Sequence, residues 1–181
     1  MSITVRSAKK SESAELDVLM QAYLAELAQF SRDLQPDEDG RYQYPYLPAY
    51  WQDPNRYPFL FRVKDTLAGF ALCRFDIDPV NGQRYMELAE FYITPDFRRQ
   101  RLGQKAANAL WELFPGYWEV RVMAANTPAL PFWQQAITSY TGGKFSEQEK
   151  QELIGRWHVF RFESVPGFEL PDDYEPDVVD Y

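Results

Sequence analysis

A cluster of basic side chains stands where the sequence predicts the start of a helix, and its chemistry is that of an anion site. The cationic residues are Arg98, Arg99, Arg101 and Lys105, with Gly103 among them. The run that follows, 106–113, holds strong helix formers with apolar residues at helical spacing. The first backbone N–H groups of a helix lack intrahelical acceptors, and the helix dipole favours negative charge there. The sequence therefore predicts that this loop binds a phosphate or pyrophosphate.

The glycine pattern of the loop narrows the class of phosphate site. The loop lacks the glycine pair and Lys-Ser/Thr ending of a Walker P-loop, and it lacks the three glycines of a dinucleotide fingerprint. It resembles the Arg/Gln-x-x-Gly-x-Gly/Ala loop of the GCN5-related N-acetyltransferases (GNATs), which grips the pyrophosphate of acetyl-coenzyme A (acetyl-CoA). Arg98 matches the first position and Gly103 the last. Arg101 stands where the family usually has its first glycine. That exchange costs the loop some freedom, since glycine alone visits positive φ freely, and it could leave a side chain near the phosphates.

Two further segments carry the same resemblance. Residues 87–98 fit the central strand of the family, which reads Glu-apolar, two variable residues, an apolar triplet and x-Pro-x-aromatic-Arg. Residues 126–133 fit the Asn-x-x-Ala-x-x-aromatic-aromatic segment of the family. One predicted helix and one predicted strand separate the two blocks, as in GNATs. The resemblance spans 3–162 and implies an α/β (α+β) GNAT fold: a mixed, mostly antiparallel central sheet of about six to seven strands flanked by helices.

The resemblance also implies acetyl-CoA as co-substrate and assigns residues to it. Backbone groups of Phe91 and Ile93 would pair with the pantetheine arm, N–H groups of the loop 98–104 would hold the pyrophosphate, and Asn126 would contact the cofactor arm. The expected cofactor-binding residues are Phe91, Tyr92, Ile93, Arg98, Arg99, Gln100, Arg101, Leu102, Gly103, Gln104, Asn126, Phe132 and Trp133. No metal ion is expected.

Acetyl transfer to an amine requires a base, and the predicted strand 84–94 carries two carboxylates. With regular alternation Glu87 shares a face with Phe91 and Ile93, whereas Glu90 lies on the other face as a solvated residue. A buried carboxylate needs a partner or has a raised pKa, and either property suits a proton acceptor. Glu87 also resembles the base glutamate of the histone-acetylating branch, where it would act through a water. A β-bulge would exchange the two assignments.

The proton for the departing thiolate has no clear donor in the sequence. Many GNATs place a tyrosine at the second aromatic position of the Asn-x-x-Ala segment, but this chain has Trp133 there. An indole N–H donates a hydrogen bond without giving up its proton at neutral pH. Solvent or another tyrosine, such as Tyr140, is left to serve as the acid.

Two functions follow from the resemblance. The first is an N-acetyltransferase that moves an acetyl group from acetyl-CoA directly to a primary amine of a small molecule or peptide. The alternative is a non-catalytic acyl-CoA binding module for sensing or assembly, which Trp133 and Arg101 favour. The formal charge of −8 argues against a nucleic-acid binder and mildly favours cationic substrates.

Length and composition indicate the domain organisation and the cellular compartment. The 181 residues predict one domain over 1–163 and an acidic C-terminal tail over 164–181. The single cysteine, Cys73, rules out an internal disulfide and suits a reducing cytoplasm. Because the N-terminus does not read as a secretory signal and no apolar stretch approaches membrane-spanning length, we expect a cytoplasmic protein without membrane contact, as a monomer or homodimer.

The remaining elements follow from periodicity and from turn residues. An aromatic, proline-rich segment, 31–55, is expected to pack onto the sheet, or alternatively to form an aromatic and acidic wall for a cationic acceptor or a dimer contact. Gly69 indicates a close backbone approach or a bulge. Strands are expected at 3–6, 57–64, 67–75, 84–94, 117–123, 144–145 and 156–162, and helices from Ser11 or Ser13 to about 29, at 103–113 and at 127–137.

Overall fold

One mixed sheet organises the molecule. The computed structural model describes residues 2–153 and 155–164, and within them seven strands form a sheet of order β1-β2-β3-β4-β5-β7-β6. Neighbouring strands are antiparallel except for β4 and β5, which are parallel. The elements are β1 (Thr4–Ser7), α1 (Ser13–Leu27), β2 (Arg56–Val63), β3 (Thr66–Ile77), β4 (Arg84–Ile93), α2 (Leu102–Leu113), β5 (Gly116–Met123), α3 (Ala129–Thr141), β6 (Phe145–Glu152) and β7 (Gly155–Ser164). The expected mixed, mostly antiparallel sheet with flanking helices is confirmed.

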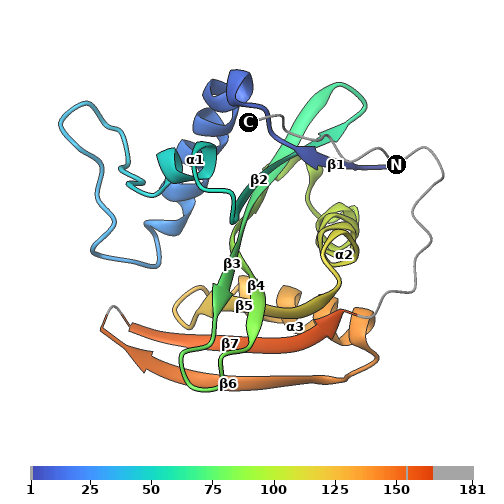
Figure 1. The fold of residues 1–181 in the computed structure, drawn as a ribbon. Helices are drawn as coiled ribbons and strands as arrows, with labels where there is room; N and C mark the ends of the chain where they lie inside the picture. Colours follow the sequence, from blue (N-terminus) through green and yellow to red (C-terminus); the bar gives the residue numbers. More distant parts are fainter. Residues whose placement is uncertain (1, 154, 165–181) are drawn as a thin grey trace.

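Helices cover both faces of the sheet (Figure 1). On one face, α2 and α3 bury side chains such as Trp111 and Ile137 against Phe160 of β7. On the other, α1 buries Leu16 and Met20 against β2 and β3. Within each helix the buried residues recur every three or four positions. A single apolar stripe is therefore removed from water on each helix. The two cores are separate clusters with the sheet between them.

The sheet parts between its two parallel strands. Pairing between β4 and β5 is confined to Met86–Leu88 and Trp118–Val120, although β4 continues to Ile93. Figure 1 shows the two halves of the sheet, β1 to β4 and β5 to β7, running in different directions. Along residues 89–93 the β5-facing edge of β4 therefore has no strand partner within the described part of the chain, and its backbone groups are available to another extended chain.

A β-bulge at Ala89 changes which side chains share a face of β4. Leu88 pairs with Cys73 and Glu90 pairs with Leu72, so Ala89 is an extra residue without a β3 partner. Phe91 and Ile93 consequently pack in the core beneath α2 and α3. Glu87 is directed to the α1 side, together with Glu90. The expectation that Glu87 shares a face with Phe91 and Ile93 is wrong because regular alternation does not hold through a bulge.

Several element boundaries differ from expectation, most of all for the strand expected at 144–145, which runs from Phe145 to Glu152 as β6. Helix α3 begins at Ala129, with Pro128 as its N-cap, and runs on to Thr141. Strand β7 extends to Ser164, whose hydroxyl accepts a hydrogen bond from the Gly116 N–H at 3.0 Å. The predicted acidic tail otherwise lies outside the described residues. Most rings of the 31–55 segment pack against α1 and its core, as the packing alternative predicted, whereas Tyr46 is 61% exposed. None of the described helices is long and apolar enough to cross a membrane.

Candidate active site

The basic loop reaches its conformation without the glycine that the family usually places there. Arg101 is the N-cap of α2 and adopts a left-handed backbone conformation with φ 59° and ψ 12°. Arg99 also has a φ of 59°. The left-handed region costs a non-glycine residue on the order of 1–2 kcal/mol. The first intrahelical hydrogen bond is donated by Lys105 to the Arg101 carbonyl, at 3.2 Å, so the N–H groups of 102–104 precede the helical ladder and can face an anion.

Gly103 allows three predicted cofactor segments to meet. A Cβ atom placed on this glycine would lie 3.2 Å from the ring edge of Phe132 and 3.5 Å from Cγ1 of Ile93. The first turn of α2 therefore packs directly on α3 and on the end of β4. The rings of Phe91 and Trp133 contact each other with centroids 5.1 Å apart, and Phe132 stacks near Phe91 at 6.2 Å.

Asn126 and Tyr140 occupy the two ends of the α3 region. Asn126 lies in the turn before α3, where its carbonyl accepts a hydrogen bond from the Ala129 N–H at 3.1 Å. Tyr140 lies near the other end of α3, and its ring contacts Trp111 and Phe162 in the core beneath α2 and α3. Burial raises the pKa of the Tyr140 phenol. The structure thus places Tyr140 on the face of the sheet opposite to Glu90, and its role as an acid stays a prediction.

Glu90 lies just beyond the bulge, enclosed by two tyrosines that are distant in sequence. Tyr23 of α1 donates a hydrogen bond to Oε2 of Glu90 at 2.6 Å, and Tyr44 donates one to Oε1 at 2.9 Å. Burial raises the pKa of Glu90 to about 7, although both tyrosine hydrogen bonds lower it. The negative charge of Glu87 raises the Glu90 pKa further, and Arg74 opposes that effect. A carboxylate with this pKa can take up a proton near neutral pH.

Glu87 has a different environment from Glu90. Its side chain is 8% exposed, and its Oε2 accepts a hydrogen bond from Arg74 Nε at 2.5 Å. Across the parallel pairing, Glu87 is in register with Glu119 of β5. The guanidinium of Arg74 compensates the buried charge of Glu87, so the contact seen in the structure is an ion pair. Sequence reasoning assigned Glu90 to solvent because neither the bulge nor the contacts from Tyr23 and Tyr44 can be read from alternation.

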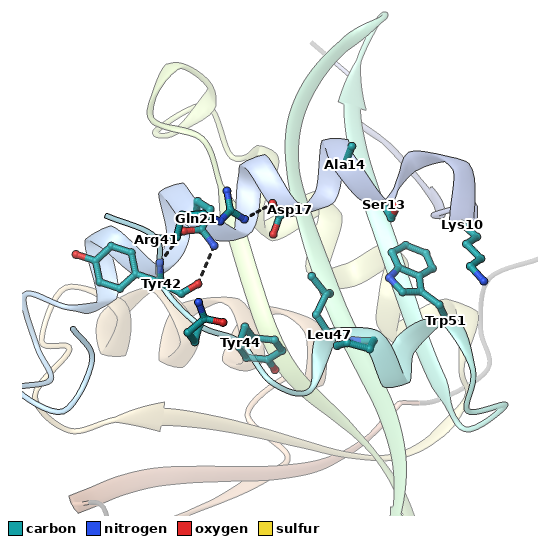
Figure 2. Close-up of a pocket in the computed structure, with 12 residues that line it drawn as sticks. Lys10, Ser13, Ala14, Asp17, Gln21, Arg41, Tyr42, Tyr44, Leu47 and Trp51 are labelled. Atoms are coloured by element: carbon teal, nitrogen blue, oxygen red, sulfur yellow. Dashed lines mark hydrogen bonds and ion pairs between the residues drawn. The ribbon is translucent and has the colours of Figure 1, made fainter. Parts of the chain in front are cut away.

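A cavity of about 470 Å³ lies between α1 and the segment 41–51 (Figure 2). Tyr44 lines it while its hydroxyl bonds to Glu90, so the cavity and this carboxylate share one side chain. Figure 2 shows Gln21 bonded to the backbone of Tyr42, and Arg41 paired with Asp17 at 2.6 Å. The lining residues are Lys10, Ser13, Ala14, Asp17, Gln21, Arg41, Tyr42, Gln43, Tyr44, Leu47, Pro48 and Trp51.

Known proteins resemble this chain in sequence family and in fold. The model of the acetyltransferase (GNAT) family matches residues 21–137. A GNAT-family acetyltransferase from Streptococcus agalactiae superposes with a TM-score of 0.67 at 17% identity, over 89% of this chain and 95% of the other. RimL, a ribosomal L7/L12 α-N-protein acetyltransferase solved with coenzyme A, gives 0.64 at 13% identity, over 92% and 97% of the two chains.

A third similar structure is the spermidine N-acetyltransferase of Vibrio cholerae in complex with CoA and spermine. Its TM-score is 0.61 at 12% identity, over 90% of this chain and 96% of the other. A search of curated protein sequences finds no significant match. At these identities the solved structures support the fold, and the family model supports the family.

Proposed function

The chain belongs to the GNAT acetyltransferase family, and on that premise we propose that it transfers the acetyl group of acetyl-CoA directly to a primary amine of a small molecule or peptide. Structures with the same fold include an acetyltransferase of spermidine and one of a protein N-terminus. Both acceptors present an amine, which supports the acceptor class. The family membership supports acetyl-CoA as the donor.

The observation that carries the proposal is the parting of β4 from β5 next to the loop before α2. An extended pantetheine arm can pair with the open edge of β4 along residues 89–93, as an added strand pairs with a sheet edge. Its pyrophosphate would then meet the N–H groups of 102–104. The contacts among Ile93, Gly103 and Phe132 hold the open edge and the loop together. A backbone N–H on this edge would polarise the thioester carbonyl.

Glu90 is the base that we propose for the reaction. An alkylamine with a pKa of about 10.4 arrives mostly protonated, so it must lose a proton before its nitrogen attacks the thioester carbon. Glu90 is largely ionised above its pKa of about 7 and can accept that proton, directly or through a water. The C–S bond then breaks, and the CoA thiolate takes a proton. Glu87 stays a second candidate for the base, with Arg74 as its present partner.

For the general acid that protonates the departing thiolate there are three candidates: solvent, Tyr140 and Tyr44. The CoA thiol is an alkyl thiol, a class whose cysteine member has a pKa of about 8.5 in water, so the departing thiolate can be protonated by solvent near neutral pH. Tyr140 is the candidate for the general acid that the sequence offered. Tyr44 is a second phenol, placed between Glu90 and the cavity, although burial raises its pKa. The buried indole of Trp133 cannot supply the proton.

A non-catalytic acyl-CoA binding module is the second candidate function. Trp133 in the usual tyrosine position favours it, since an indole replaces the phenol that many family members use. Both candidates predict cofactor binding, and only the enzyme predicts turnover.

The deciding experiment is a calorimetric titration with acetyl-CoA, followed by free-thiol release over a panel of amines that includes spermidine and peptides with free N-termini. Binding with thiol release on one of these amines would establish the enzyme. Binding without release on any of them would favour the binding module. Absence of acetyl-CoA binding would contradict both functions, although the fold and family would stand.

A further inference from the structure

The side chain of Arg98 is directed to α1 and not to the phosphate site. Its Nη2 atom lies 2.9 and 2.8 Å from the two carboxylate oxygens of Glu26, near the end of α1. Its Nε–H donates to the carbonyl of Ile93 at 2.7 Å. The guanidinium carbon lies 5.3 Å from the ring centroid of Tyr92, whose hydroxyl donates to the same Glu26 carboxylate at 2.9 Å.

This contact holds the first residue of a strained loop, 98–104. Arg99 and Arg101 both have left-handed backbones, which arginine does not favour in isolation. Strained backbone persists only where neighbouring contacts determine it. Arg98 is bound on both sides, by the end of β4 and by α1, so the loop starts from a fixed point.

Helix α1 connects the same contact to the proposed base. Tyr23, one helical turn before Glu26, donates to Glu90, and its ring lies 5.8 Å from that of Tyr92. One helix therefore supplies both the carboxylate that holds Arg98 and the hydroxyl that holds Glu90.

We propose that Glu26 is a positioning residue for the cofactor loop: by holding the Arg98 guanidinium against α1, it fixes the loop in its anion-binding conformation. This inference rests on the proposed function of the loop as the acetyl-CoA site. Nothing in the arrangement requires Glu26 to touch the cofactor, and its negative charge would repel the pyrophosphate if it did. Removing that charge should therefore weaken binding only through the loop.

The test compares two carboxylates of α1 that each pair with an arginine outside the helix. Glu26→Gln weakens the contact with Arg98, whereas Glu15→Gln weakens the contact of Glu15 with Arg62 of β2, at 2.5 Å and away from the loop. We expect calorimetric titration to show acetyl-CoA binding about two- to fivefold weaker for Glu26→Gln, the range of an exposed ion pair, and unchanged for Glu15→Gln. The KM for acetyl-CoA should rise by the same factor while kcat is retained.

A double-mutant cycle separates positioning from a general loss of stability. If Glu26 acts through Arg98, the affinity loss caused by Arg98→Lys should be smaller in the Glu26→Gln background than in the wild type. Equal acetyl-CoA affinity of the wild type and Glu26→Gln, or losses that simply multiply, would overturn the inference. A wild type that does not bind acetyl-CoA would instead overturn the proposed function on which the inference rests.

Discussion

The hydroxyl of Tyr23 donates a 2.6 Å hydrogen bond to Glu90, joining α1 to the central strand at the point where β4 leaves β5. The hydroxyl of Tyr44 occupies the other oxygen of the same carboxylate. Because the bulge at Ala89 directs Glu87 and Glu90 to the same side, the negative charge of Glu87 raises the pKa of Glu90. Of these two carboxylates, Glu87 is the one that accepts a hydrogen bond from an arginine. Glu87 is thus held in an ion pair, and Glu90 has a pKa raised to about 7, which gives testable consequences.

Replacing Glu90 should stop turnover without affecting cofactor binding. We expect Glu90→Gln to lower kcat by about 100-fold or more, since a general base contributes on the order of 10²–10⁴. Acetyl-CoA affinity, measured by calorimetry, should stay near that of the wild type. Glu87→Gln is the matched comparison on the same strand. A larger loss of kcat in Glu87→Gln than in Glu90→Gln would show that Glu87, and not Glu90, acts as the base.

The activity should depend on the ionisation of Glu90. Since the carboxylate must be ionised to accept a proton, kcat/KM should rise with pH and level off above about 7, the pKa of this group. The hydrogen bond from Tyr23 lowers that pKa, so Tyr23→Phe should move the inflection to higher pH. A profile of kcat/KM against pH for the two proteins measures this shift. An inflection that stays in place or moves to lower pH would contradict the assignment.

Glu90 should also make folding stability depend on pH. Its pKa in the folded protein, about 7, lies above the ordinary value of 4.5, so between these values the folded state binds more protons than the unfolded state. The free energy of unfolding therefore falls as pH rises from about 4.5 to 7. Glu90→Gln should remove this slope and be more stable than the wild type at pH 8 by about 1–3 kcal/mol. Denaturant unfolding at several pH values tests it, and a wild type as stable at pH 8 as at pH 5 would argue against it.

The left-handed backbone of Arg101 predicts a stabilising substitution. Arg101→Gly should raise the free energy of unfolding by about 1 kcal/mol, because glycine adopts a φ of 59° without the penalty of a Cβ atom. Arg101→Ala removes the same charge but keeps the penalty, so it should not stabilise. Denaturant unfolding of the two variants separates conformation from charge. Equal stability of both would show that the loop backbone is not strained at this position.

Gly69 should tolerate no side chain. A Cβ atom on Gly69 would lie 2.0 Å from the carbonyl oxygen of Tyr92, which is main-chain and cannot rotate away. We expect Gly69→Ala to destabilise the protein by about 3 kcal/mol or more, measured as the free energy of unfolding. Gly103→Ala is the comparison, because its nearest neighbour would be the ring of Phe132, which can shift. A smaller loss for Gly69→Ala than for Gly103→Ala would contradict the close approach of β3 and β4.

Local patterns in the sequence were sufficient for the family, the order of elements and the apolar faces of the helices. The run 106–113 indicates its helix because the buried residues of α2 follow from a period that any short segment carries in itself. Gly69 likewise indicated a close approach or a bulge, because a missing side chain is a local fact, and the structure shows the close approach to Tyr92 together with a register shift beside Gly69. Such features depend on residues that are neighbours along the chain, and these can be read directly from the sequence.

The electrostatic roles of the two glutamates were decided only by the tertiary structure. One extra residue at Ala89 places Glu87 on the same face of β4 as Glu90, and no local pattern in 84–93 indicates this bulge. The pKa of Glu90 then depends on burial and on Tyr23 and Tyr44, which are 67 and 46 positions away. Ionisation depends on charges and solvent in three dimensions, so it is set by what the fold brings together. The sequence by itself determined that two carboxylates stand on the central strand, and the folded chain determined that one of them, Glu90, has a pKa raised to about 7.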